Sequence, residues 1–146
     1  NLICSCFESD NSYEVLVVVN GCKDNAPDLV KNFSKTINPN VKLIELTRPS
    51  KSKAVRRGIL QSTGDICCFI DDDISKNFHD IPSVMQDLVN MFNYINDFDY
   101  LYAERIIRNN DQRSKMSRIF NHLTRKLFSI DATDTQCGLK MFNKKF

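Results

Sequence analysis

The sequence predicts an α/β fold, a three-layer α/β/α sandwich built on a mostly parallel sheet. Two observations predict it. Short runs of β-branched and apolar residues alternate along the chain with segments whose apolar residues recur at helical spacing. The run EVLVVVN at residues 14–20 is almost continuously apolar, as in a strand that helices cover on both faces. We expect all 146 residues to form one domain, because this length supports one hydrophobic core.

A helix is expected directly after this first strand. Asp24 or Asn25 can cap it, and Pro27 suits its first turn. Its apolar residues recur at helical spacing and are Leu29, Val30, Phe33 and Ile37. The run VKLIELT at residues 41–47 then predicts a second strand, so that strand and helix alternate.

The middle of the chain continues the alternation. The basic segment RPSKSKAVRRGILQS, residues 48–62, predicts a short helix, and ICCFI at 66–70 predicts a strand. A further helix follows, with its apolar positions at Val84, Leu88, Val89, Phe92 and Ile95. The run YLYAE at residues 100–104 indicates the next strand.

The last third predicts one more helix and one more strand. The helix has an apolar stripe made of Met116, Ile119, Phe120, Leu123 and Leu127. The strand is LKMF at residues 139–142. The sequence contains no run of 18 apolar residues, so it predicts no membrane-spanning helix.

Charge is distributed unevenly along the chain. Residues 1–100 carry 10 Lys/Arg and 14 Asp/Glu, whereas residues 101–146 carry 10 and 4. An acidic first part and a basic last part suit a metal site beside a patch for an anionic partner, although two ordinary solvated faces would look the same. The six cysteines show no zinc-binding spacing, and we expect reduced thiols in the cytoplasm.

Three aspartates in CCFIDDDIS, residues 67–75, follow the predicted strand directly. Because side chains alternate along a strand, Asp71 and Asp73 should point one way and Asp72 the other. Two carboxylates about 6 Å apart repel by about 3 kcal/mol at an effective dielectric constant near 20. Mg²⁺ or Mn²⁺, which prefers oxygen ligands and often shares them with a phosphate, would offset this repulsion. An acidic turn that caps a helix is the simpler alternative.

Two classes of enzyme place aspartates in this way. The spacing of Asp71, Asp73 and Ser75 fits the DxDx[ST] pattern and resembles haloacid-dehalogenase-type phosphatases, in which the first Asp is the nucleophile. In those enzymes the motif follows the first strand of the core, whereas here two strand–helix units precede it. In the second class the aspartates hold a metal that bridges the diphosphate of a nucleotide-sugar.

The order of motifs along the chain fits the second class. From EVLVVVNGCKDN through SKSKAVRRGILQSTGDICCFIDDD to DTQCGLKMF, the sequence resembles family 2 glycosyltransferases of the GT-A fold. The last motif looks most like the branch that transfers sugars to dolichyl or other polyprenyl phosphates. The resemblance implies an inverting transfer from a UDP- or GDP-sugar to a lipid phosphate at the cytosolic face of a membrane. Family members open with a further strand and a Pro-x-x-Asn-Glu turn, so we expect that this chain lacks its first strand.

The resemblance also assigns roles at the donor site. Asp71 and Asp73 match the metal-binding motif, and Asp73 is the stronger candidate for a direct ligand. Asp72 would face the nucleotide or solvent. Asn20 falls where the family binds the base and ribose, and Lys51 matches a lysine that can neutralise diphosphate charge. The alternative for Lys51 is an ordinary solvated basic loop.

The sequence departs from the family pattern at several of these positions. Val19 and Asn20 stand where acidic residues are common, which leaves the choice of base open. Ser50 and Ser52 replace the glycines of a Gly-Lys-Gly segment. Ser75 stands where a Gln often follows the metal motif, which weakens the case for a third ligand.

Basic residues mark the expected acceptor site. Arg105 follows YLYAE where the family has a Gly-Ser-Arg turn, and Arg113 and Ser117, four residues apart, resemble the pair that binds the acceptor phosphate. Asp134 is the candidate catalytic residue, as a general base or as a group that orients the sugar or an Arg; a turn-forming Asp is its alternative. The basic amphipathic helix over residues 105–126 suits anionic lipid headgroups, whereas nucleic-acid binding lacks interleaved aromatic residues.

Two further functions remain open at this point. A transferase of the same fold that builds a polysaccharide would differ only in its acceptor. A non-catalytic remnant would bind metal and nucleotide without turnover, and the altered residues Val19 and Asn20 leave room for it.

Overall fold

The computed structural model describes residues 13–71, 81–103, 112–129 and 137–144, without the side chains of 81–83 and 112–117. The chain forms two compact units that meet in sequence between Cys67 and Cys68. Each unit is described by itself below.

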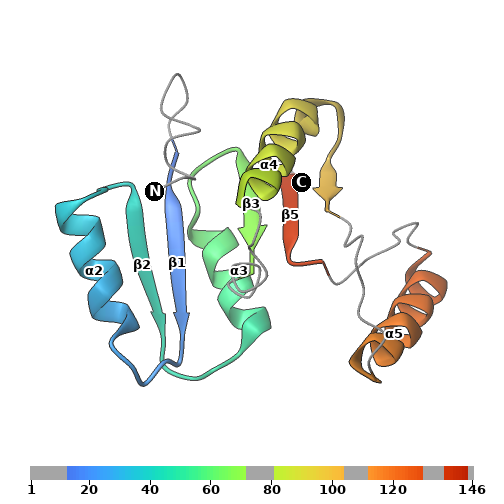
Figure 1. Cartoon of the computed structure of the whole chain (residues 1–146), viewed down its shortest axis with the longest axis horizontal. Coiled ribbons are helices and arrows are strands. Elements are labelled where there is room, and N and C mark those ends of the chain that lie inside the picture. The colour runs from blue at the N-terminus through green and yellow to red at the C-terminus, as the bar shows by residue number, and fades with distance from the viewer. Residues whose placement is uncertain (1–12, 72–80, 104–111, 130–136, 145–146) are drawn as a thin grey trace. The chain divides into compact units, whose positions relative to one another are not determined.

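The first unit is built on two parallel strands. Strand β1 (Val15–Asn20) pairs with β2 (Val41–Leu46) in a register that runs from Val15 opposite Val41 to Asn20 opposite Leu46. Helix α2 (Ala26–Thr36) lies along β2, and α3 (Lys51–Gln61) lies along β1 (Figure 1). These bounds confirm the strands and helices expected in the first half of the chain. The parallel pairing brings the carboxyl ends of β1 and β2 to one edge.

Helix α2 begins where its capping residues predict. Asn25 is the N-cap, Pro27 lies in the first turn, and the Ala26 N–H donates a 3.1 Å hydrogen bond to Asp24 Oδ1. Of the apolar residues that recur here at helical spacing, Leu29 and Ile37 are exposed. The buried apolar residues of this unit are Val19, Val41 and Ala54.

A carboxylate joins three segments of the first unit at the start of β1. Glu14 Oε1 accepts hydrogen bonds from the Thr63 N–H and from Thr63 Oγ1, the latter at 2.8 Å, and Oε2 accepts from Lys42 Nζ at 2.9 Å. The Glu14 side chain is only 13% exposed. Burial alone would raise the pKa of this carboxyl, but the hydrogen bonds from Thr63 and Lys42 outweigh it and lower the pKa from 4.5 to about 2. Glu14 is therefore ionised across the physiological range.

The second sheet is not parallel throughout. Its strands are β3 (Ile66–Ile70), β4 (Tyr100–Tyr102) and β5 (Leu139–Asn143), in the order β3-β5-β4. Strands β4 and β5 run antiparallel, with Tyr100 opposite Phe142. This corrects the expectation of a mostly parallel sheet: the last strand enters between two earlier strands and reverses direction. The prediction of an α/β fold is confirmed.

The second unit contains most of the buried apolar residues that the structure describes. Helix α4 (Ile81–Tyr94) continues into a 3-10 turn, η2 (Ile95–Asp97), and Ile95 there is only 1% exposed. The core of this unit consists of Met85, Leu88, Met91, Ile95, Cys137, Leu139 and Met141. Strand β3 is less buried than its sequence suggests, because Cys68 and Ile70 are exposed.

Helix α5 (Gln112–Phe128) confirms the last predicted helix. Four residues of its predicted apolar stripe, Ile119, Phe120, Leu123 and Leu127, are exposed. No helix in the described part of the chain is long and apolar enough to cross a bilayer.

Candidate functional site

The end of β3 contacts the start of β5 at the first of the three aspartates. The Asp71 N–H donates a 2.9 Å hydrogen bond to the Gly138 carbonyl. A Cβ built on Gly138 would lie 2.8 Å from Asp71 Cβ and 3.0 Å from Asp71 Oδ2, closer than side-chain atoms normally approach. The absence of a side chain at Gly138 therefore leaves the space that the Asp71 carboxylate occupies. The first residue of DDD thus contacts the last residue of QCG, although the two are far apart in the sequence.

Strand β4 ends at the same edge. The Ala103 N–H, directly after β4, donates a 3.1 Å hydrogen bond to the Leu139 carbonyl at the start of β5. The carboxyl ends of β3 and β4 therefore lie on either side of the beginning of β5. Ligands of open α/β sheets bind outside the carboxyl ends of strands, so this edge is the candidate site of the second unit.

Several predicted site residues lie outside the described residues. They are Asp72, Asp73, Arg105 and Asp134. Arg113 and Ser117 lie in the first half of α5, where the backbone is described and the side chains are not. Their assigned roles remain predictions. Residues 72–80, 104–111 and 130–136 contain four of these candidates. The described residues next to these segments are Asp71, Ala103 and Cys137, and all three lie at the edge formed by β3, β4 and β5.

Two predicted nucleotide-binding positions come together in the first unit. Asn20 ends β1, and its Oδ1 accepts a 2.6 Å hydrogen bond from the Ser50 N–H, directly before α3. Lys51 is the first residue of α3 and is exposed. The side-chain oxygen of Asn20 thus fixes the start of the helix that carries Lys51, while its NH₂ group keeps its capacity as a donor.

Gly21 makes this arrangement possible. Its φ is +69°, in the left-handed region that favours glycine. A Cβ there would lie 2.7 Å from Pro49 N, so the turn after β1 and the segment before α3 contact each other through backbone atoms. The Gly21 N–H also donates a 2.9 Å hydrogen bond to the Leu46 carbonyl. The turn is therefore restrained by a hydrogen bond to the end of β2 and by the backbone contact with Pro49.

Among the described residues, no three His, Cys, Asp or Glu side chains gather in a group that could hold a metal ion. Asp71 is the described member of the predicted metal motif. Its carboxylate lies in the space left by Gly138, at a strand end, which is compatible with a divalent cation held together with the predicted ligand Asp73. The Asp71 carboxylate has the chemistry that a hard cation requires, and metal binding at this edge remains a prediction.

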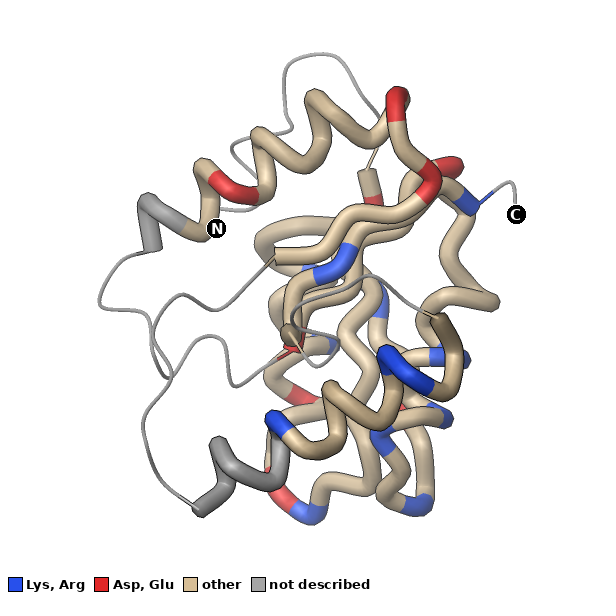
Figure 2. Tube along the Cα trace, turned by 90° about the vertical axis from the view of Figure 1, so that its right-hand side faces the viewer, with Lys and Arg blue, Asp and Glu red and all other residues tan. Residues whose placement is uncertain are grey.

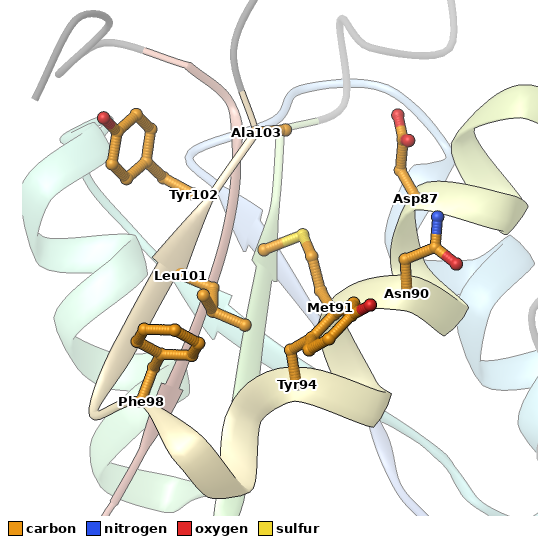
Figure 3. A pocket seen from close by; sticks show the side chains of 8 residues that line it. All are labelled: Asp87, Asn90, Met91, Tyr94, Phe98, Leu101, Tyr102 and Ala103. Carbon is orange, nitrogen blue, oxygen red and sulfur yellow. The ribbon is translucent and has the colours of Figure 1, made fainter.

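A pocket of about 400 Å³ lies between α4 and β4. Met91, Tyr94, Phe98 and Leu101 give it an apolar and aromatic wall, whereas Asp87 and Asn90 line another part of it (Figure 3). Ala103, at the end of β4, also belongs to its lining. None of the predicted site residues that the structure describes lines this pocket.

Two of these features were not predicted from the sequence. The space that Gly138 leaves for Asp71 depends on the pairing of β3 with β5, for which the sequence has no local signal. The contact of Glu14 with Thr63 joins positions far apart in the chain. An acidic residue directly before a buried strand, with a lysine near the start of the next strand, was the available signal.

Known proteins resemble the chain along its length. The model of the family described as Glycosyl transferase family 2 matches residues 1–146. A dolichyl-phosphate beta-glucosyltransferase of Dictyostelium discoideum is 28% identical over 92% of this chain and 43% of its own length. The enzyme of the same name from Homo sapiens is also 28% identical, over 92% of this chain and 44% of its own.

A bacterial relative extends this similarity to another lipid acceptor. An undecaprenyl-phosphate 4-deoxy-4-formamido-L-arabinose transferase of Pseudomonas fluorescens is 23% identical over 96% of this chain and 40% of its own length. The chain spans less than half of the length of each of these relatives.

Proposed function

The chain belongs to glycosyltransferase family 2, and from this premise we propose that it moves a sugar from a nucleotide-diphosphate donor to a polyprenyl phosphate such as dolichyl phosphate. The observation that carries the proposal is the contact of Asp71 with Gly138. It joins the acidic motif to the QCG motif at a strand-end edge. The names of the relatives support a polyprenyl phosphate as the acceptor.

Family membership gives the chain the GT-A fold. In the described residues, strands and helices alternate, and β1 and β2 are parallel, in agreement with that fold. The antiparallel β5 places the QCG motif beside the carboxyl end of β3 rather than at the opposite edge. The fold thus explains why a residue late in the chain contacts Asp71.

The donor diphosphate needs positive charge as it leaves. We assign Asp71 and Asp73 to the binding of Mg²⁺ or Mn²⁺, which when bound stabilises the negative charge of the departing diphosphate. For Lys51, the first residue of α3, we retain the role that the family resemblance assigns, neutralisation of diphosphate charge. Within its own unit, Asn20 holds the start of α3 in place through Ser50. Asp72 would contact the nucleotide. A UDP- or a GDP-sugar fits this assignment equally well.

The transfer inverts the anomeric centre. An oxygen of the acceptor phosphate forms a bond to the anomeric carbon, and the bond from that carbon to the diphosphate oxygen breaks on the opposite side. A phosphate is already ionised at neutral pH, so positioning and charge neutralisation matter more than proton removal. We assign these tasks to Arg105, Arg113 and Ser117. Asp134 orients the sugar, or acts as general base if the acceptor is a hydroxyl.

The location follows from the acceptor. A polyprenyl chain is embedded in a bilayer, so only its phosphate can reach a domain outside the bilayer. We therefore place the protein at the cytosolic face of a membrane as a peripheral protein, in the compartment where nucleotide-sugars and reduced cysteines occur. The described cysteines are free thiols, which is compatible with this placement.

Calorimetric titration of UDP and of GDP, each with and without Mn²⁺, tests the donor site. We expect one of the two nucleotides to bind only with the metal present, and Asp73→Ala to abolish this binding. Asp65→Ala is the matched control, because it removes an exposed aspartate directly before the first residue of β3. Failure of both nucleotides to bind in the presence of Mn²⁺ would overturn the proposed donor site in this chain.

Activity assays then distinguish a transferase from a non-catalytic relative and from a phosphatase. Incubation of the nucleotide-sugar with a short-chain polyprenyl phosphate should yield a lipid-linked sugar. Metal-dependent nucleotide binding without any product would identify a non-catalytic relative instead. Release of nitrophenol from p-nitrophenyl phosphate, lost in Asp71→Asn, would favour the phosphatase alternative.

A further inference from the structure

Helix α5 presents an apolar surface that no described residue covers. Of the twelve large hydrophobic side chains exposed in the described residues, five lie on its last ten positions. Leu127 is 74% exposed and Leu123 is 49% exposed. These five side chains are Ile119, Phe120, Leu123, Leu127 and Phe128. Isolated exposed hydrophobic residues are common, but a contiguous group of this kind marks an interaction surface.

Four of these side chains form a single stripe. With about 100° of rotation per residue, Ile119, Phe120, Leu123 and Leu127 fall within an arc of about 100°. Asn121, which is only 5% exposed, lies on the far side of the helix from the centre of this arc. The helix therefore buries the polar Asn121, whereas its apolar stripe is exposed, unlike a helix that packs its apolar face on its own core.

The charge of α5 has one sign. Residues 112–128 contain five Lys/Arg, one His and no Asp or Glu. Figure 2 shows blue cationic positions and no red along the described part of this helix. Lys126 borders the apolar stripe, and the exposed Arg118, His122 and Arg125 continue around the helix from it. An apolar arc bordered by cations is typical of helices that lie in a membrane interface.

We propose that α5 binds an anionic membrane surface, with its apolar stripe inserted at the boundary between headgroups and acyl chains. The stripe would bury its four side chains there, while Lys126 and the neighbouring cations contact lipid phosphates and carboxylates. The charge favours a lipid surface over a second copy of the chain, because two copies packed through α5 would bring ten cations together without one acid from either helix.

The inference depends on α5 alone and does not require sugar transfer. It adds to the proposed function the surface through which the protein would reach a lipid-borne acceptor. Vesicle binding and nucleotide binding are separate measurements, so either proposal can fail without the other.

Co-sedimentation of the full chain with vesicles tests the inference. One set of vesicles contains phosphatidylcholine alone, and the other contains phosphatidylcholine with phosphatidylserine. We expect binding to the anionic vesicles, weakened by high salt because surface charges are then screened. Leu123→Gln with Leu127→Gln should lower the partition coefficient by about 100-fold, since both leucines lose their burial in lipid.

Charge reversal at the border of the stripe provides the second variant. Lys126→Glu changes the charge by two units and should lower binding to anionic vesicles by about 30-fold. Helix α2 provides the matched controls: Leu29 is exposed to a similar degree, and Lys35 lies in the last turn of α2 as Lys126 does in α5. Leu29→Gln and Lys35→Glu should leave vesicle binding unchanged. Circular dichroism of all variants verifies that the helices form.

Three outcomes would overturn the inference. The first is an absence of sedimentation with either kind of vesicle. The second is binding that the α5 variants and the α2 controls reduce equally. The third is a concentration-dependent dimer, detected by light scattering, that Leu123→Gln with Leu127→Gln dissociates; the stripe would then be an interface between copies.

Discussion

Replacing Gly138 by alanine perturbs the contact between the acidic motif and the start of β5. The new Cβ would lie 2.8 Å from Asp71 Cβ and 3.0 Å from Asp71 Oδ2. Carbon atoms in ordinary contact are about 3.5–4.0 Å apart, so a displacement of about 1 Å is required. The 2.9 Å hydrogen bond from the Asp71 N–H to the Gly138 carbonyl restrains the backbone. Because the backbone fixes the position of Asp71 Cβ, the backbone must shift against this hydrogen bond, and the Asp71 carboxylate moves with it.

Two quantities should change in this variant. Insertion of a methyl group into a packed contact typically lowers the free energy of unfolding by about 1–3 kcal/mol. A misplacement of about 1 Å in a functional group can cost on the order of 100-fold. We expect the dissociation constant for the nucleotide with Mn²⁺ to rise by about 10- to 100-fold, and binding without the metal to stay undetectable, as in the wild type.

Urea denaturation and calorimetric titration measure these two effects. Gly64→Ala is the control, because the nearest atom to its Cβ is the Ile66 carbonyl oxygen at 3.4 Å, an ordinary contact. The reasoning is refuted if Gly138→Ala matches wild type in both measurements, or if it binds nucleotide normally after a loss of stability. In the second case Asp71 would have a structural role only.

Three further substitutions test the first unit. Glu14→Gln should lower the free energy of unfolding at pH 7 by about 2–3 kcal/mol, after allowance for solvent screening. The pKa of Glu14 is about 2 in the folded protein and 4.5 in the unfolded chain. The difference from wild type, measured by urea titrations at each pH, should therefore be complete above pH 4.5 and vanish as the pH falls to about 2. An undiminished difference at pH 2 would contradict the assignment of the effect to ionised Glu14. Gly21→Ala should cost about 1–3 kcal/mol by thermal denaturation, because of its positive φ and the nearby Pro49; an unchanged melting temperature would mean that the turn can relax. Asn20→Ala should remove about 1 kcal/mol of protection from the Ser50 amide, an increase of about fivefold in its hydrogen-exchange rate, which an unchanged rate would refute.

Local patterns predicted the elements well because each pattern has a local cause. The β-branched run before Asn20 and the cap and proline before α2 determine strand and helix within a few residues. The direction of β5 has no such local signal, since the alternation of side chains is the same in parallel and antiparallel strands. The sequence LKMF therefore predicted a strand but not its orientation between β3 and β4.

The α5 stripe illustrates a second limit of sequence patterns. The spacing of Ile119, Phe120, Leu123 and Leu127 specifies that one face is apolar, and the structure has this face. Periodicity does not specify what the face contacts, because core and lipid give the same pattern. The absence of acids in α5 was visible in the sequence and distinguished this helix from α2, which has Asp28 in its first turn.

The positions of two site candidates relative to the strands were predicted from the sequence, whereas their roles remain predictions. Asp71 directly follows β3, and Asn20 ends β1. The specific contacts were not predictable, because they join residues that the chain order keeps far apart. The bond from the Ser50 amide to Asn20 and the space left by Gly138 both depend on which strands are neighbours.

The close approach of Gly21 to Pro49 also limits how long one loop can be. Asn20 is level with Leu46 in the sheet, and only residues 47–50 connect β2 to α3. An inserted residue adds up to 3.8 Å of chain, enough to move Ser50 out of hydrogen-bonding reach of Asn20 and to shift Lys51 with it. Substitutions in this loop can accumulate over evolution, whereas insertions and deletions should be selected against.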